Sequence, residues 1–213
     1  MNFDVEAELG AVERVVVCLE REGWPARAVT LRRSYATSVE NLWEAVTRAE
    51  RIPRWLLPVS GDLMLGGRFQ LEGNAGGVVT ECEPRERFSI TWEFAGDVSW
   101  VEVQITKEGA GLVRLSLTHT TCLSDHWTTY GPGAVGVGWE LSLMGLSLHI
   151  ARPEDAMPDE AAFAASSEGR AIIEGSSGRW GGAAVACGTA PEIAGVAARR
   201  TTAFYTGDSI GPA

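Results

Sequence analysis

Hydrophobic and polar residues alternate through the middle of the chain, from about residue 66 to residue 120. In the clearest run every second side chain is apolar, with Phe88, Ile90, Trp92 and Phe94 on one face. A period of two is typical of a strand that buries one face. Similar runs predict five strands, Arg68–Glu72, Gly77–Glu83, Phe88–Phe94, Val98–Thr106 and Leu112–Thr120. Their short, mostly glycine-containing connections favour an antiparallel meander with one apolar face.

The segment from residue 127 to 150 carries one carboxylate, Glu140, and neither lysine nor arginine. Its apolar residues also fit a strand-like alternation, but its length favours a helix because strands seldom exceed ten residues. On a helical wheel Trp139 and Leu143 share one apolar face, while Leu141 and Met144 share the opposite one. A helix with two apolar faces is expected to lie between two layers, with one face closing the sheet and the other covered by the C-terminal residues. A membrane span is disfavoured, because the fully apolar stretch is short and rich in Gly, Ser and His.

The flanking regions predict further elements. Two β-rich runs, at 15–19 and 28–35, precede a capping box at 37–40 that opens a helix. A second box at 47–50 predicts a short helix that reaches Trp55. These elements complete a first domain over residues 1–151.

After Pro153 the composition shifts to Ala, Gly, Ser and Glu. Pro158 and Asp159 are predicted to open a helix that ends near Gly188, and a capping box at 189–192 opens a last helix toward Gly207. Residues 152–213 are therefore expected to form a helical C-terminal extension that packs on the long helix.

Composition narrows the classes of partner. The net charge of −10 and a pI near 4.8 disfavour nucleic acids and anionic membranes. The acidic N-terminus has no basic-then-apolar pattern, so we expect no secretory signal and a cytoplasmic location. The four cysteines have no paired spacing and are interpreted as ordinary buried thiols, Cys18, Cys82, Cys122 and Cys187. We expect neither a metal nor a cofactor.

The order of the elements resembles the START-like (SRPBCC) superfamily, the helix-grip fold of the birch-pollen allergen. The residues that carry the resemblance are RRSYATSVENLWEAVTRAERIPRWL at 32–56, GGRFQLE at 66–72, ERFSITWEF at 86–94, LTHT at 117–120 and GWELSLMGLSLHI at 138–150. The nearest subgroup is named for activators of the heat-shock chaperone ATPase. The resemblance implies an α+β fold in which a curved antiparallel sheet wraps around a long C-terminal helix. It also implies a cavity between sheet and helix that holds apolar molecules.

Residues on the inferred inward faces are the candidates for ligand binding, namely Trp55, Trp92, Phe94, His119, Trp139 and Leu143. For the tryptophans, core packing is the alternative to a pocket wall. His119 is either a core histidine satisfied by one hydrogen bond or a group that orients a ligand or transfers a proton. Glu140 points either into the cavity or outward beside the tail.

Two local motifs are interpreted as structural. A hydrolytic triad requires spatial proximity and an oxyanion hole, which the consecutive residues Ser124, Asp125 and His126 do not imply. The GxGxxG match at 131–136 lacks a preceding buried strand and a parallel βαβ unit, so its glycines predict a turn.

The leading functional hypothesis is binding of a small hydrophobic or aromatic molecule without defined catalysis. One alternative is a cyclase or dehydratase that acts on a polyketide-like substrate, which requires His119 or Glu140 to point inward. Another is a chaperone-interacting protein. The sequence leaves a homodimer open.

Overall fold

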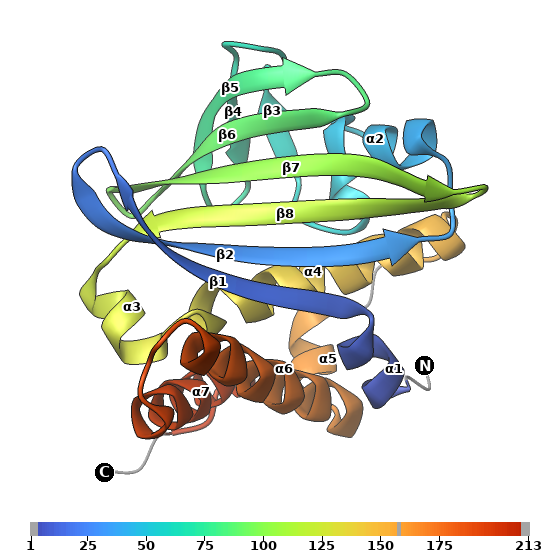
Figure 1. Cartoon of the computed structure of the whole chain (residues 1–213). Coiled ribbons are helices and arrows are strands. Elements are labelled where there is room, and N and C mark those ends of the chain that lie inside the picture. Colours follow the sequence, from blue (N-terminus) through green and yellow to red (C-terminus); the bar gives the residue numbers. More distant parts are fainter. Residues whose placement is uncertain (1–3, 157–158, 210–213) are drawn as a thin grey trace. The chain divides into compact units, whose positions relative to one another are not determined.

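The computed structural model describes residues 4–156 and 159–209. Its helices are α1 (Val5–Gly10), α2 (Val39–Thr47), the 3-10 turn η1 (Ile52–Arg54), α3 (Asp125–Tyr130), α4 (Gly133–Ala151), α5 (Glu160–Ala165), α6 (Ser167–Ala186) and α7 (Pro191–Thr206). Its strands are β1 (Val12–Arg21), β2 (Trp24–Tyr35), β3 (Val59–Gly61), β4 (Arg68–Leu71), β5 (Gly76–Glu83), β6 (Arg87–Phe94), β7 (Asp97–Gly109) and β8 (Leu112–Cys122) (Figure 1).

The strands form one eight-stranded antiparallel sheet in the order β1-β2-β8-β7-β6-β5-β4-β3. Together with the long helix α4, this sheet confirms the predicted α+β helix-grip fold. Within the described residues the chain forms two compact units. The first unit comprises 4–31, 122–141 and 159–209, and the second comprises 32–121 and 142–156. The predicted domain boundary at residue 151 stays a prediction.

The second unit contains the antiparallel meander that the alternation predicts. Strand β6 pairs along its whole length with the first part of β7, from Arg87 opposite Gln104 to Phe94 opposite Asp97. The buried aliphatic residues of β7 and β8 alternate, as Val101, Val103 and Ile105 on one strand and Val113, Leu115 and Leu117 on the other. The predicted apolar face is therefore confirmed.

The short helices of the second unit differ in detail from the prediction. Ser38, not Thr37, caps α2, and its hydroxyl accepts a hydrogen bond from the Asn41 backbone N–H. The capping box at 47–50 opens no α-helix; only the three-residue η1 follows, with a proline at its start. Proline cannot donate a backbone hydrogen bond, which limits the helix that it begins.

The first unit holds the C-terminal helices α6 and α7, which pack along each other. They meet the first half of α4 at its glycines. A Cβ added at Gly136 would lie 2.2 Å from the Trp180 ring, and one at Gly138 would lie 2.7 Å from the Tyr205 hydroxyl. That hydroxyl donates a 2.7 Å hydrogen bond to the Ala134 carbonyl. The prediction named large residues for this contact and missed the glycines, which let aromatic rings lie directly on the helix backbone.

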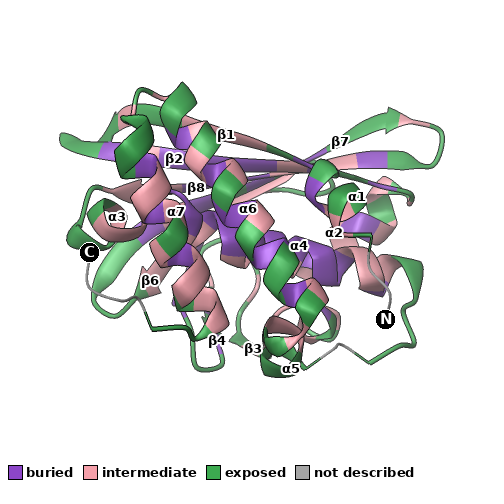
Figure 2. Cartoon of the chain, turned by 90° about the horizontal axis from the view of Figure 1, so that it is seen from below, coloured by how far each residue is buried: buried purple, intermediate pink, exposed green. Residues whose placement is uncertain are grey.

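Helix α4 has no exposed residue between positions 133 and 150, consistent with its lack of charge (Figure 2). In the described part of the chain it is the one helix whose length and hydropathy would suffice to cross a membrane. Half of that stretch is buried inside the structure, and the core helix of a folded domain passes the same test.

Within residues 159–209 the tail contains three helices where two were predicted. Asp159 caps α5 as expected, by accepting from the Ala162 backbone N–H, while Pro158 lies outside the described residues. Ser166 ends α5 and caps α6, because its extended backbone (φ −73°, ψ 160°) interrupts the helix. The predicted cap of α7 is wrong, since Ala190 occupies that position without a side-chain hydrogen bond.

The cysteines are more accessible than predicted. Cys18 is exposed, because it lies on the edge strand β1, and Cys82, Cys122 and Cys187 are half-buried.

The contact between Gly136 and Trp180 makes a direct prediction. We expect Gly136→Ala to lower the free energy of unfolding by about 1–3 kcal/mol, because the new methyl group collides with a fully buried ring. Gly178→Ala on α6 is the matched control, since a Cβ there meets nothing within 4 Å and the residue is exposed. The control should stabilise the protein by about 0.5–1 kcal/mol through helix propensity. Chemical denaturation measures both, and equal effects of the two substitutions would contradict the packing.

Candidate functional site

A buried imidazole interrupts the aliphatic inner face of strand β8. His119 follows Val113, Leu115 and Leu117 in the buried phase of the strand and is 6% exposed. Its Nε2 lies 2.8 Å from the Ser99 Oγ on β7. The Ser99 hydroxyl donates its own proton to the Trp92 carbonyl, at 3.2 Å. Because a hydroxyl has one proton, His119 must be the donor in the first hydrogen bond.

The sheet register brings these three residues together. Trp92 on β6 pairs with Ser99 on β7, and His119 on β8 pairs with the neighbouring Val101. The Trp92 and His119 rings meet edge to face, with centroids 5.9 Å apart. We call Trp92, Ser99 and His119 the polar row. Ser99 was not among the predicted site residues, although it lies in phase with Val101 and Val103 on the buried side of its strand.

Trp92 also belongs to an apolar cluster of the second unit. The buried centre of this cluster is Ile52, Phe69 and Leu71. Partly buried hydrophobic side chains pack around that centre, namely Leu56, Leu57, Val59, Leu63, Ile90 and Trp92. Through Trp92 the polar row therefore adjoins apolar side chains that are only partly buried.

Burial controls the charge of the polar row. It lowers the pKa of His119 to about 4, because the imidazolium would lose its hydration. The ring is therefore neutral at pH 7. A general acid or base works best when its pKa lies near the working pH, so this histidine is better suited to hydrogen bonding than to proton transfer.

Three other predicted site residues of the second unit, Trp55, Leu143 and Phe94, lie in environments that differ from that of the polar row. Trp55 is 5% exposed, and its indole N–H donates a 2.8 Å hydrogen bond to the Ala45 carbonyl, so it packs in the core. Leu143 is 1% exposed, and its carbonyl accepts from the Tyr35 hydroxyl. The inward placement of Phe94 is wrong. Its side chain is 53% exposed, because it ends β6 beside the Ala95–Gly96 turn.

The last of these candidates, Trp139, is 8% exposed and belongs to the first unit. A role of the six residues as one ligand-binding set stays a prediction.

A second buried histidine, His149, lies near the end of α4. The guanidinium of Arg51 approaches its Nε2 at 3.3 and 3.4 Å. Burial, and then the charges of Arg51 and Arg54, lower the pKa of His149. A neutral ring can accept these hydrogen bonds, so this histidine helps to hold η1 in place.

Glu140 forms a buried ion pair with Arg14 in the first unit. Arg14 donates from Nε and Nη2 to the two carboxylate oxygens, both at 2.6 Å. Its Nη1 donates to the Leu9 and Val12 carbonyls at 3.1 and 2.8 Å. The two side chains are 7% and 5% exposed. Glu140 therefore neither faces a cavity as a free acid nor emerges beside the tail, as the sequence had suggested.

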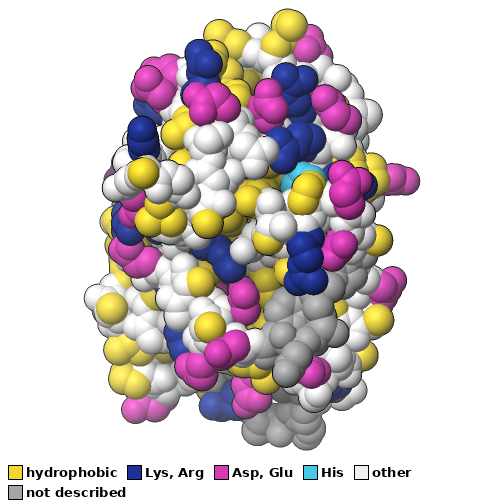
Figure 3. Space-filling view, turned by 90° about the vertical axis from the view of Figure 1, so that its right-hand side faces the viewer, with side chains coloured by type: hydrophobic (Ala, Val, Ile, Leu, Met, Phe, Trp, Pro, Cys, Tyr) yellow, Lys and Arg dark blue, Asp and Glu magenta, His cyan; other side chains and the backbone are white. Residues whose placement is uncertain are grey.

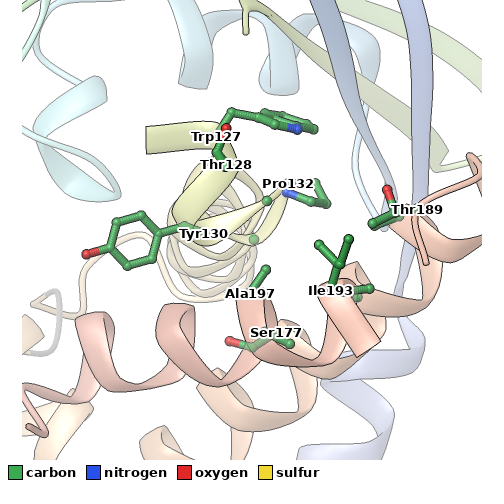
Figure 4. Close-up of a pocket in the computed structure, with 14 residues that line it drawn as sticks. Trp127, Thr128, Tyr130, Pro132, Ser177, Thr189, Ile193 and Ala197 are labelled. Atoms are coloured by element: carbon green, nitrogen blue, oxygen red, sulfur yellow. The ribbon is translucent and has the colours of Figure 1, made fainter. Parts of the chain in front are cut away.

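The first unit also contains a pocket of about 60 Å³ among α3, the start of α4, α6 and α7. Figure 4 shows Trp127 and Pro132 on one side of it and Ala197, Ser177 and Ile193 on the other. That volume is enough for a few water molecules. Sequence analysis did not anticipate this pocket, which forms where Gly131, at φ +60°, turns the chain from α3 toward α4.

Neither local motif near this pocket forms a reactive site. Ser124 caps α3 by accepting from the Trp127 backbone N–H, and the exposed His126 ring lies against Tyr130. Gly131 forms the predicted turn, which leads from α3 and not directly from the sheet, and Gly133 is already the first residue of α4. Within 4–156 and 159–209, no three His, Cys, Asp or Glu side chains are grouped to hold a metal ion.

Surface charges of both signs are interspersed with hydrophobic side chains on the face shown in Figure 3. Several arginines of the second unit pair with acidic residues, including Arg68 with Glu93 and Arg87 with Glu83. In each of these pairs a carboxylate offsets the charge of the arginine.

Comparison with known proteins identifies the family. A profile described as activator of Hsp90 ATPase homolog 1-like protein matches residues 36–150, more than half of the chain. The chain belongs to this family. That assignment confirms the resemblance to the START-like superfamily. A search of curated proteins finds no match.

Solved structures of similar proteins support the family's fold. The crystal structure of CalU16 from Micromonospora echinospora is 30% identical, with a TM-score of 0.65, and the match covers 84% of this chain and 99% of CalU16. Its solution structure gives 32% identity and a TM-score of 0.69 over 83% and 97% of the two chains. The Aha1 dimer from Colwellia psychrerythraea is 16% identical, with a TM-score of 0.50 over 60% and 98%. At that identity the last likeness concerns the fold alone.

The buried ion pair predicts a strong asymmetry between single and double substitutions. Arg14→Met should lower the free energy of unfolding by about 3–5 kcal/mol, because it strands the Glu140 carboxylate in the interior. The double variant Arg14→Met/Glu140→Leu should return to within about 1 kcal/mol of the parent protein, since neither charge is then buried. Urea denaturation gives these values. Additive losses in the double variant would show that the pair is not coupled.

The polar row predicts a specific dependence of stability on pH. The folded-state pKa of His119 lies below its unfolded value, so unfolding takes up a proton between pH 6.5 and about 4. The histidine's contribution is complete above pH 6.5, and about 3 kcal/mol of it is lost as the pH falls to 4. His119→Gln should remove this contribution to the pH dependence of the free energy of unfolding, and the contribution of His149 should remain. Identical pH profiles for parent and variant would contradict a buried neutral imidazole.

Proposed function

We propose that this protein binds a small, uncharged aromatic molecule on the inner face of the second unit's sheet, with the polar row as its anchor. The observation that carries this proposal is the buried chain of hydrogen bonds from His119 through Ser99 to the Trp92 carbonyl. It interrupts the run of buried aliphatic residues on β7 and β8. Burying such groups costs free energy even when they are paired, so a role in orienting a ligand accounts for their presence.

The chemistry of the row defines the ligand class. The Ser99 oxygen accepts one hydrogen bond from His119, and a hydroxyl oxygen can accept a second. A ligand hydroxyl group would supply that second donor. The partly buried ring of Trp92 offers an aromatic surface beside it, and His119 is neutral at pH 7. A hydroxylated aromatic compound without formal charge meets these requirements.

The catalytic alternative has less support. A cyclase or dehydratase needs an acid or a base with access to the substrate. Both carboxylate oxygens of Glu140 are bound by Arg14, and the pKa of His119 is about 4. The row can orient a substrate, but neither residue is poised for proton transfer at neutral pH.

An interaction with a chaperone is the second alternative, and it rests on the description of the family. A homodimer is a further proposal, suggested by the dimeric Aha1 neighbour. The cytoplasmic location expected from the acidic N-terminus also remains a proposal. Co-purification of the tagged full chain with the chaperone would test the first interaction. Light scattering of the full chain alone would test the homodimer.

The affinities for 2-naphthol, which has a hydroxyl group, and for naphthalene, which has none, are compared. Their difference separates the hydrogen bond to the polar row from non-specific apolar contact. The full chain should bind 2-naphthol, observed by quenching of tryptophan fluorescence and by native mass spectrometry. Ser99→Ala should weaken 2-naphthol about tenfold, the loss of one hydrogen bond, and change naphthalene less than twofold. Ser89→Ala, which removes a serine hydroxyl of β6 that donates to the Glu81 carboxylate, is the matched control and should bind both probes normally. Equal affinity of parent and Ser99→Ala for 2-naphthol would refute the anchor.

A further inference from the structure

Two cysteines that are far apart in the sequence meet in the first unit. Cys18 lies on β1, and Cys187 lies at the C-terminal end of α6. Their sulfur atoms are 2.8 Å apart, although 169 positions separate the residues. Cys18 is exposed and Cys187 is half-buried, so a small reagent in solution can reach the pair.

Regular backbone structure holds both thiols. Cys187 is the C-cap of α6, and the chain then turns through Gly188 at φ +98°. The Gly188 N–H donates to the Val185 carbonyl and the Thr189 N–H to the Ala184 carbonyl, at 2.9 and 3.0 Å. This pair of hydrogen bonds is the Schellman motif, which fixes a helix end. Cys18 lies inside a ten-residue strand that contacts α6.

We infer that Cys18 and Cys187 form a reversible disulfide that ties the C-terminal helices to β1 when the protein meets a hydroperoxide. A reversible disulfide accounts for this arrangement better than an accidental contact of mobile side chains or a permanent disulfide that defines the fold. The thiols approach each other from two ordered elements, yet one of them remains open to solvent. Accessible disulfides of this kind are the ones that exchange with thiols in solution.

The reaction proceeds in two balanced steps. The exposed Cys18 thiolate attacks one oxygen of hydrogen peroxide, which breaks the O–O bond and gives a sulfenic acid and hydroxide. The Cys187 sulfur then attacks the Cys18 sulfur and expels the second oxygen as water. In sum, two thiols and one peroxide give one disulfide and two waters. Burial and the hydrogen bond with Cys18 raise the pKa of Cys187, which disfavours its thiolate as the nucleophile that attacks the peroxide first.

The disulfide would restrict both the unfolded chain and the turn that follows Cys187 in the folded chain. It would close a loop of most of the chain, and long loops give the largest stabilisation in the chain-entropy description. It would also fix the turn after Cys187. Thr189 in that turn lines the 60 Å³ pocket, so oxidation would hold one wall of this pocket in place.

Treatment of the purified full chain with hydrogen peroxide, followed by thiol blocking and non-reducing peptide mapping, tests the inference. We expect a cross-linked peptide that contains Cys18 and Cys187 and that disappears on addition of dithiothreitol. The midpoint of thermal unfolding should rise by roughly 5–10 °C on oxidation and fall again on reduction. Cys18→Ser and Cys187→Ser should each lose both effects.

Cys82→Ser is the matched control, because Cys82 is half-buried and lies in the second unit. It should keep the cross-linked peptide and the shift in midpoint. Oxidation of Cys18 to a sulfenic or sulfonic acid without a bond to Cys187 would overturn the inference. So would a disulfide between two chains, or a thermal shift that survives in Cys18→Ser.

Discussion

The buried ion pair of Arg14 and Glu140 is the interaction on which the course of helix α4 depends. Helix α4 is almost free of charge, and none of its residues from 133 to 150 is exposed. Its single carboxylate would be costly in that environment without a partner. Arg14 on β1 satisfies both oxygens of Glu140 and uses a remaining nitrogen to bind two carbonyls near the end of α1. One arginine thus joins three elements of the first unit.

Glycines make the second contribution to the burial of α4. At Gly136 and Gly138 aromatic side chains of the tail lie on the helix surface where any larger residue would collide with them. Burial of Tyr205 in this contact raises the pKa of its hydroxyl to about 12, so the hydroxyl stays protonated and can donate to the Ala134 carbonyl. Charge pairing and close packing together allow a helix of this composition to lie inside a folded chain.

Local patterns predicted most of the longer elements but not their long-range partners. Alternation located β6, β7 and β8, and the absence of charge located α4, because both signals lie within a few consecutive residues. The partner of Glu140 is 126 residues away, and the partner of Cys18 is 169 residues away. Hydrophobic periodicity describes neighbouring residues, so it carries no information on partners that are this far apart in the sequence. His119 was found as the one polar residue on an apolar face, whereas Ser99 resembled an ordinary strand residue until the register placed it opposite Trp92.

In the proposed function the polar row anchors an uncharged aromatic ligand. The most direct measurement is an NMR titration of the full chain with 2-naphthol that observes the His119 ring nitrogens and the Trp92 indole. Before addition, His119 should be neutral at pH 7, with its proton on Nε2. On addition, the His119 and Trp92 signals should shift together, while those of the exposed His126 stay in place. A proton on Nδ1 alone, or unchanged Trp92 and His119 signals at saturating probe, would contradict the account.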